Sequence, residues 1–310
     1  MKTAVLLFLS MILLFGCVGE PASQTPAPGG EVTPPAEEMP GPGGETQPPA
    51  ADCEDSFAFS QLQSVKLSEV AKFTITATCA QGNEIALYLN DKLAGKMNVP
   101  SNDPTVLNFD IAANVDGTSE VVVKSDGSTI YAEELNIAPL GSTDISGSDY
   151  DQISNKKWIA VAFDLDNRVK IGSIGAYMKR LATQTLQDST IKAEIRNDKA
   201  GNPGDTIVAT SEVPIAQTTL TDNWLYMNYD VTLQPGKYWI VFMVAKNEPT
   251  IVGDAVTLHY VTPDRLSQPN DMTRMMTLEW SESGRVWEQT DWVELSFDKE
   301  YAVVVSANAH

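Results

Sequence analysis

Histidine and cysteine are scarce in this sequence, which limits the chemistry it can support. The 310 residues include two histidines, His259 and His310, and three cysteines. Two histidines leave little material for a zinc site or for histidine-based catalysis. The sequence also lacks a Gly-x-Ser-x-Gly elbow, a phosphate-binding glycine loop and a Cys-x-x-Cys pair. We therefore expect a protein that is not an enzyme.

Basic residues are few as well. Lysine and arginine number 21 against 41 aspartates and glutamates, which gives a formal net charge of −20. Such a charge repels nucleic acid, so we expect no nucleic-acid partner. An acidic surface fits a soluble domain outside the cell, and it also fits carboxylates gathered around a divalent cation such as calcium.

A twelve-residue apolar run, Ala4–Phe15, is too short to span about 30 Å of hydrocarbon as a helix but suits a signal peptide. It ends in Leu14-Phe15-Gly16-Cys17, which resembles a lipobox. Residues 1–17 are thus predicted to be a lipoprotein signal peptide that includes the anchor Cys17. The alternatives are an ordinary signal peptide with an incidental cysteine and an uncleaved anchor. The predicted location is extracytoplasmic, at the cell surface, with the membrane as a partner through the lipid.

Residues 18–51 have the composition of a linker. Nine of the eighteen prolines lie here, without any lysine or arginine. The segment has too little apolar surface to offset the entropy of ordering, so we expect a disordered Pro/Gly/Glu stalk.

Residues 52–139 alternate between apolar and polar side chains in short runs. In Lys72–Thr78, the side chains of Phe73, Ile75 and Ala77 share one face. Asn90-Asp91 and Asp126-Gly127 separate pairs of such runs and indicate hairpins. About seven short strands without a convincing helix predict an immunoglobulin- or fibronectin-like β-sandwich. By pattern, this module resembles small Ig-like domains of prokaryotic surface proteins.

With Cys17 assigned to lipid, Cys53 and Cys79 remain as a pair in this module. Outside the cytosol they are expected to form a disulfide. Two free buried thiols are the alternative.

Residues 140–152 form a predicted Ser/Gly/Asp connector, and residues 153–310 a second β module. Its predicted strands include Ile171–Lys179, Thr190–Arg196, Trp224–Val231 and Tyr238–Ala245. The last is apolar on both faces, which predicts a central strand covered on both sides, with Trp239 in the core. Nine or so antiparallel strands suggest a jelly-roll-like sandwich, so the whole fold class is all-β.

The second module contains motifs that resemble one family of exported proteins. The motifs are Ile159–Phe163, Ile171–Met178, Lys192–Asp198, Pro203-Gly204, Ile207–Ala209, Trp224 and Leu233–Val241. They resemble the choice-of-anchor R type of exported β-sandwich. Ser281–Trp287 keeps the glycine and tryptophan of that family's late hairpin and lacks its aspartate. The resemblance implies a carbohydrate-binding-like sandwich on a surface-anchored protein, without a known activity.

Aromatic side chains offer platforms for sugar rings. Alternation along Trp224–Val231 points Trp224, Tyr226 and Asn228 away from the face that carries Leu225 and Met227. On another strand, Lys192, Glu194 and Arg196 point outward by the same argument. If both strands belong to one sheet, Trp224, Tyr226, Asn228 and Arg196 form a ligand face. The alternative is that these aromatic residues simply cover a sheet.

Two acidic clusters are candidates for calcium. Asp164 and Asp166 place oxygens at alternate positions, and Asn197, Asp198 and Asp205 lie in a predicted long hairpin loop. Neither matches an EF-hand, and turn chemistry explains both without a metal. Calcium is therefore the one cofactor that the sequence suggests.

These features together predict a cell-surface lipoprotein with a binding or adhesion role, carried by its C-terminal sandwich, with a glycan or an envelope protein as partner. One alternative is a structural subunit of a cell-envelope assembly without a small ligand. Another is an extracytoplasmic hydrolase with paired carboxylates.

Overall fold

A computed structural model describes residues 53–143, 145, 149–181, 189–246, 256–261, 272–283, 286–289, 291–295 and 300–310. Cys17 and the predicted stalk 18–51 lie outside the described residues. The described chain consists of β-strands and one short 3-10 helix, η1 (Ile215–Gln217), so the predicted all-β fold class is confirmed. No helix in these ranges is long and apolar enough to cross a membrane.

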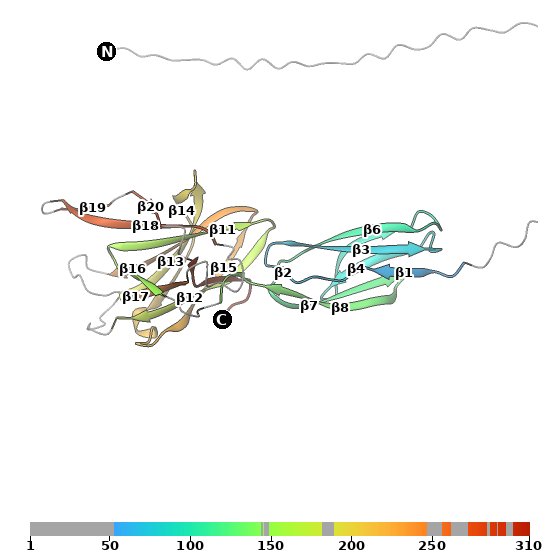
Figure 1. Ribbon diagram of the computed structural model, residues 1–310, viewed down its shortest axis with the longest axis horizontal. Helices are drawn as coiled ribbons and strands as arrows, with labels where there is room; N and C mark the ends of the chain where they lie inside the picture. Colours follow the sequence, from blue (N-terminus) through green and yellow to red (C-terminus); the bar gives the residue numbers. More distant parts are fainter. Residues whose placement is uncertain are drawn as a thin grey trace, which may run out of the picture. The chain divides into compact units, whose positions relative to one another are not determined.

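The first sandwich contains a three-stranded sheet, β1-β3-β6, and a five-stranded sheet, β2-β8-β7-β4-β5 (Figure 1). Its strands are β1 (Ser56–Phe59), β2 (Val65–Lys66), β3 (Val70–Thr78), β4 (Glu84–Leu89), β5 (Lys92–Asn98), β6 (Thr105–Ala112), β7 (Gly117–Ser125) and β8 (Ser128–Ala138). Phe73, Ile75 and Ala77 of β3 are fully buried, as the alternation predicts. They share one apolar core with Ile85 and Leu87 of β4, and that core joins the two sheets.

Two tight turns of this sandwich occur where the sequence predicts hairpins. Asn90 and Asp91 between β4 and β5 both adopt positive φ angles, 48° and 63°. Asp126 and Gly127 between β7 and β8 do the same, with 46° and 83°. Positive φ at both central positions is the geometry that matches the twist of paired strands, and these residue types tolerate it.

A disulfide joins Cys53 to Cys79, whose Cα atoms lie 5.5 Å apart. The predicted pairing is thus confirmed. It ties the segment before β1 to the end of β3.

The second sandwich contains two seven-stranded sheets. The β12 sheet is ordered β10-β17-β12-β22-β9, with β15 paired to β12 and β21 to β17. Its strands are β9 (Leu140–Gly141), β10 (Asp149–Ile153), β12 (Val169–Arg180), β15 (Asn223–Leu233), β17 (Val256–Val261), β21 (Glu300–Tyr301) and β22 (Val303–Ser306).

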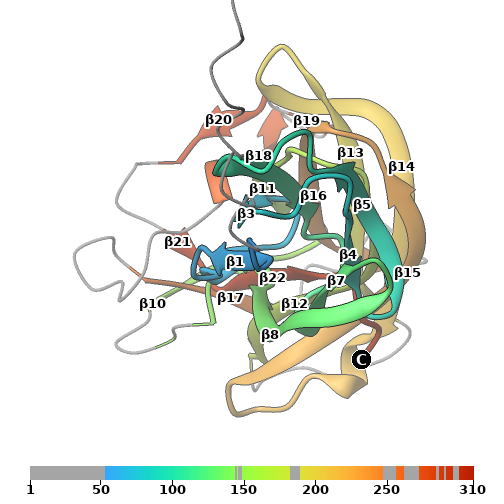
Figure 2. The ribbon, with the colours of Figure 1, turned by 90° about the vertical axis from the view of Figure 1, so that its right-hand side faces the viewer.

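The β16 sheet is ordered β14-β13-β16-β11-β18-β19, with β20 paired to β18. Its strands are β11 (Lys157–Leu165), β13 (Ser189–Lys199), β14 (Asn202–Pro214), β16 (Gly236–Lys246), β18 (Met272–Ser283), β19 (Val286–Gln289) and β20 (Val293–Glu294). In Figure 2, β11, β16 and β18 lie above β12 and β17, so the two sheets form opposite layers.

Apolar side chains from both layers fill the space between the sheets. Ile174 of β12, Met227 of β15 and Ile240 of β16 belong to one buried cluster. The preceding residue, Trp239, faces the other way and is fully buried in a second cluster with Ala160, Ala162, Val241, Met243 and Met276. Strand β16 is therefore central and covered on both faces, as its continuous apolar run predicts.

The predicted connector 140–152 contains two short strands that pair within the second sandwich. Leu140–Gly141 forms β9 against β22, and Asp149–Ile153 forms β10 against β17. Each strand contributes one apolar side chain, Leu140 or Ile153, to the core of the second sandwich. Both strands are short and flanked by a polar, Gly- and Ser-rich sequence, so no alternating pattern indicated them.

Candidate functional site

The outer surface of the β12 sheet carries a series of aromatic rings. Tyr150 of β10 is the cross-strand partner of His259 of β17, and Tyr177 of β12 is the partner of Trp224 of β15. Their neighbours Met178, Leu225 and Leu258 are buried in the core. Because side chains alternate along a strand, these rings lie on the side away from the core. We call Tyr150, His259, Tyr177, Trp224 and Tyr226 the aromatic face.

The rings of the aromatic face follow one another across four adjacent strands. Ring centroids are 5.8 Å apart for Tyr150 and His259, 5.2 Å for His259 and Tyr177, and 5.6 Å for Tyr177 and Trp224. Tyr226 follows at 6.2 Å from Trp224. Such spacings are typical of aromatic pairs that stabilise one another.

Exposure differs along the aromatic face. Tyr150 is 47% exposed. Tyr177, Trp224 and Tyr226 are half-buried, and His259 is buried. The accessible ring surface therefore begins at Tyr150 and continues over Tyr177 to Trp224.

A lysine and a carboxylate sit beside these rings. Lys179 Nζ lies 4.6 Å from the centroid of Tyr150 and 3.4 Å from Asp222 Oδ1. The same carboxylate oxygen lies 2.7 Å from His259 Nε2. Both the Lys179 and the Asp222 side chain remain partly accessible to solvent. The arrangement offers a hydrogen-bond donor and an acceptor next to the exposed ring of Tyr150.

Burial lowers the pKa of His259, and the positive charge of Lys179 acts in the same direction. The carboxylates of Asp222 and Asp149 oppose this shift. The net direction is downward, which favours the neutral form of the His259 ring.

Asn228 was predicted to belong to the ligand face, but its side-chain amide is hydrogen-bonded to the backbone of His310. Its Nδ2 donates to the carbonyl oxygen of His310 at 2.7 Å, and its Oδ1 accepts from the amide of His310 at 3.0 Å. The His310 ring stacks on Tyr226, with centroids 4.1 Å apart. This contact covers part of the Tyr226 end of the aromatic face.

The predicted composite face of Trp224, Tyr226, Asn228 and Arg196 is wrong. Trp224 and Tyr226 lie on β15, which pairs with β12, whereas Arg196 lies on β13, which pairs with β14 and β16 in the opposite sheet. Arg196 is also engaged, since its guanidinium donates to Glu194 Oε2 from Nε and Nη2. Alternation predicts which way a side chain points but not which strand lies beside it.

The predicted calcium cluster around Asn197, Asp198 and Asp205 does not form. Strand β13 continues to Lys199 and β14 begins at Asn202, so a two-residue turn replaces the predicted long loop. Asp198 Oδ1 accepts from Trp239 Nε1 at 2.8 Å, and its Oδ2 accepts from the amide of Gly201 at 2.9 Å. Asp205 pairs with Lys199 at 2.8 Å.

The other calcium candidate, Asp164 with Asp166, is not a ligand cluster either. Within the described residues, no three or more histidine, cysteine, aspartate or glutamate side chains lie close enough together to hold a metal ion. The amides of Asp166 and Asn167 donate to Ser68 Oγ, and Asn167 Nδ2 donates to the Ser68 carbonyl. The turn at Asp166 and Asn167 is therefore fixed by hydrogen bonds to Ser68.

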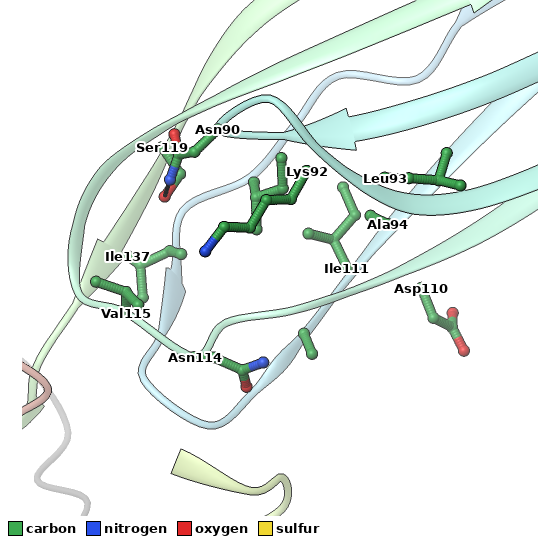
Figure 3. A pocket seen from close by; sticks show the side chains of 12 residues that line it. Asn90, Lys92, Leu93, Ala94, Asp110, Ile111, Asn114, Val115, Ser119 and Ile137 are labelled. Carbon is green, nitrogen blue, oxygen red and sulfur yellow. Dashed lines mark hydrogen bonds between the residues drawn. The ribbon is translucent and has the colours of Figure 1, made fainter. Parts of the chain in front are cut away.

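A hollow of about 380 Å³ opens between β5 and β6 of the first sandwich (Figure 3). Ile111 and Ile137 are among its apolar walls, and the amine of Lys92 reaches into it (Figure 3). Among the described residues that line it there is no aromatic ring. It therefore lacks a stacking platform and differs from the aromatic face.

Sequence reasoning identified Trp224 and Tyr226 but missed Tyr150, Tyr177, Lys179, Asp222 and His259. Tyr177 and Lys179 carried a usable signal, since they alternate with the inward Ala176 and Met178. Tyr150 and His259 join the site only through the pairing of β10 with β17.

Comparisons with known proteins do not identify a family or a function for this chain. No protein-family model matches the chain, and no curated protein matches it. One solved structure is described as "Structural basis for the promiscuous specificity of the carbohydrate-binding modules from the beta-sandwich super family". The match covers 66% of this chain and 95% of that one, with 9% sequence identity and a TM-score of 0.21. A similarity this low carries no functional argument.

Proposed function

We propose that this protein is a non-catalytic, extracytoplasmic lipoprotein that binds glycans at the cell surface through the aromatic face. The observation that carries the proposal is the run of rings from Tyr150 to Trp224 across four adjacent strands, beside Lys179 and Asp222. A pyranose ring presents apolar C–H groups on its face and hydroxyls around its edge. Aromatic rings next to a donor and an acceptor complement both parts of it.

The charge of the protein narrows the ligand class. The chain has a formal net charge of −20, and the one lysine described beside the exposed ring of Tyr150 is already 3.4 Å from a carboxylate. Polyanionic polymers are therefore disfavoured by long-range repulsion. Neutral glycans carry no such penalty, and we propose them as the ligands.

The proposed location rests on separate features. The Cys53–Cys79 disulfide fits an oxidising compartment outside the cytosol. The lipobox-like Leu14–Cys17 and the proline-rich residues 18–51 favour an anchored protein held away from the membrane. The motifs that resemble choice-of-anchor R domains support the same assignment.

The proposal is tested on an array of neutral oligosaccharides with the full-length protein in detergent. We expect the wild type to bind a subset of the array and Trp224→Ala to bind the same glycans several-fold more weakly. Circular dichroism and thermal unfolding establish that the variant is folded. Absence of binding by the folded wild type would instead favour the structural subunit of an envelope assembly.

A further inference from the structure

The opposite face of the second sandwich carries a cluster of tryptophans. On the outside of the β16 sheet, Trp239 is fully buried, and the half-buried Trp158 and Trp292 pack against its cluster. The small side chains of Ala160 and Ala162 on β11 belong to the same cluster and leave room for these large rings. This surface is therefore built around indole rings.

The tip of the β13–β14 hairpin is fixed to this cluster. Asp198 accepts hydrogen bonds from Trp239 Nε1 at 2.8 Å and from the amide of Gly201 at 2.9 Å. One carboxylate thus holds both the buried indole and the turn that follows it. The residues beyond Asp198 are consequently held in a defined position before any ligand arrives, which lowers the entropic cost of binding.

A cleft of about 440 Å³ opens beside this tip. Trp292, Leu278 and Pro203 give it apolar walls, and Asn202, Asp291 and the ion pair of Lys199 with Asp205 give it polar ones. Its polar and apolar walls come from segments distant in sequence, namely the hairpin tip, β18 and the segment before β20.

Asn202 and Asp291 contribute two polar side chains to this cleft. In the described part of the chain, neither the Asn202 amide nor the Asp291 carboxylate makes a hydrogen bond or an ion pair, and both residues are exposed. Lys199 and Asp205 pair at 2.8 Å but are themselves highly exposed, so they remain able to bond to a ligand as well. The cleft thus offers an amide, a carboxylate and a half-buried indole ring together.

We infer that the cleft around Trp292, Asn202 and Asp291 is a second binding site, for a neutral sugar ring. Hydroxyl groups satisfy both the amide and the carboxylate, whereas a purely apolar ligand would leave them unpaired. The carboxylates of Asp205 and Asp291 outnumber the one amine of Lys199, so they disfavour an anionic sugar. This inference rests on the proposed glycan-binding function and adds a second site on the opposite sheet.

Two sites on opposite layers have a functional consequence. The aromatic face belongs to the β12 sheet and the Trp292 cleft to the β16 sheet, so one short oligosaccharide cannot occupy both. A polymer has many equivalent sugar units, and one protein molecule could then hold two polymer chains. Binding to a dense polysaccharide would gain from this bivalency, whereas binding to a single oligosaccharide would not.

The inference is tested with full-length protein in detergent on arrays of neutral oligosaccharides printed at low and high density. The variants are Tyr150→Ala for the aromatic face, Trp292→Ala and Asn202→Ala for the cleft, and the pair Tyr150→Ala with Asn202→Ala. Asp103→Asn, an exposed carboxylate variant in the first sandwich, is the matched control. Because Asn202 is exposed, its variant keeps the test valid even if Trp292→Ala fails to fold.

On the high-density array we expect each cleft variant to weaken binding about two- to ten-fold, the range for one lost stacking contact or hydrogen bond. On the low-density array, where each molecule binds through one site at a time, the loss should be smaller. The double variant should lose binding beyond either single variant, and Asp103→Asn should match the wild type. Unchanged binding by Asn202→Ala and folded Trp292→Ala, together with weaker binding by Tyr150→Ala, would overturn the second site and leave the proposed function intact. Weaker binding by the cleft variants alone would support the cleft and contradict the role of the aromatic face. A folded wild type that binds no printed glycan would overturn both.

Discussion

The ring of Tyr226 lies directly over Gly175, its cross-strand partner. A Cβ atom at position 175 would be 2.6 Å from Tyr226 Cε1 and 2.8 Å from Val304 Cγ2. Glycine at this position therefore lets the tyrosine ring lie flat against the β12 sheet and follow Trp224 in the aromatic face.

This relationship predicts the effect of Gly175→Ala. The added methyl group must displace Tyr226 or Val304, so we expect a loss of about 1–3 kcal/mol in the free energy of unfolding. Urea unfolding of the purified protein measures it. Gly95→Ala is the comparison, because its Cβ would approach Phe109 only to 3.3 Å. A Gly175→Ala protein as stable as the wild type would show that the ring is not held against the sheet.

A second prediction concerns Asp198, the residue that the sequence suggested as a calcium ligand. Asp198→Ala removes the partner of the buried Trp239 indole and of the Gly201 amide, and we expect a loss of about 1–3 kcal/mol. We also expect calcium and a chelator to leave the melting temperature of the wild type unchanged. A rise in melting temperature with calcium that disappears in Asp198→Ala would restore the metal-site interpretation.

The disulfide supplies a third prediction. Cys53 and Cys79 are 26 residues apart in the sequence. Closing a loop of this length stabilises the folded state by about 3 kcal/mol on the chain-entropy model. The double variant Cys53→Ser, Cys79→Ser should lose that amount in denaturant unfolding, and a reducing agent should destabilise only the wild type. Equal sensitivity of both proteins to the reducing agent would contradict the assignment.

Burial of His259 predicts a pH dependence of stability. Because its pKa is lowered in the folded state, the unfolded chain binds the proton more readily. The free energy of unfolding should therefore fall as the pH drops below about 6.5, the ordinary histidine pKa, and stop falling below the folded pKa. Asp222 opposes the shift and Lys179 reinforces it. Stability measured between pH 5 and 8 in wild type and His259→Gln isolates this contribution, and identical pH profiles would contradict it.

The anchor prediction concerns residues outside the described structure. Cys17→Ser should release the protein from membranes or leave it unlipidated with its signal peptide intact. Metabolic labelling with a fatty acid and fractionation of the cells measure both effects. A wild-type protein that carries no lipid would contradict the lipobox interpretation.

Local features of the fold were predictable from the sequence, because they depend on near neighbours. Alternation in β15 correctly predicts that Leu225 and Met227 are buried and that Trp224 is not, and the turn at Asn90 and Asp91 follows from residue type. The pairing of strands depends on contacts between distant segments. For that reason the sequence could propose a face of Trp224 and Arg196 only on the condition that their strands share a sheet, and the two strands lie on opposite sheets.

The candidate site was also hard to predict, because its residues come together through the pairing of distant strands. Tyr150 lies in a short, polar strand whose pairing with β17 brings it next to His259. The local sequence around Tyr150 does not predict that contact. Asn228 was correctly predicted to point outward, but its occupation by the backbone of His310 depends on a segment 82 residues away.

The most direct test of the proposed function is the affinity of Tyr150→Ala for the best neutral glycan on the array. Tyr150 is 47% exposed on the short strand β10, so its side chain can be removed with little effect on the fold. Tyr88→Ala in the first sandwich is the matched control, because that tyrosine also lies beside a lysine but outside the aromatic face. Calorimetry should show binding weakened about two- to ten-fold by Tyr150→Ala and unchanged by Tyr88→Ala. Equal affinities for wild type, Tyr150→Ala and Tyr88→Ala would contradict glycan binding through the aromatic face.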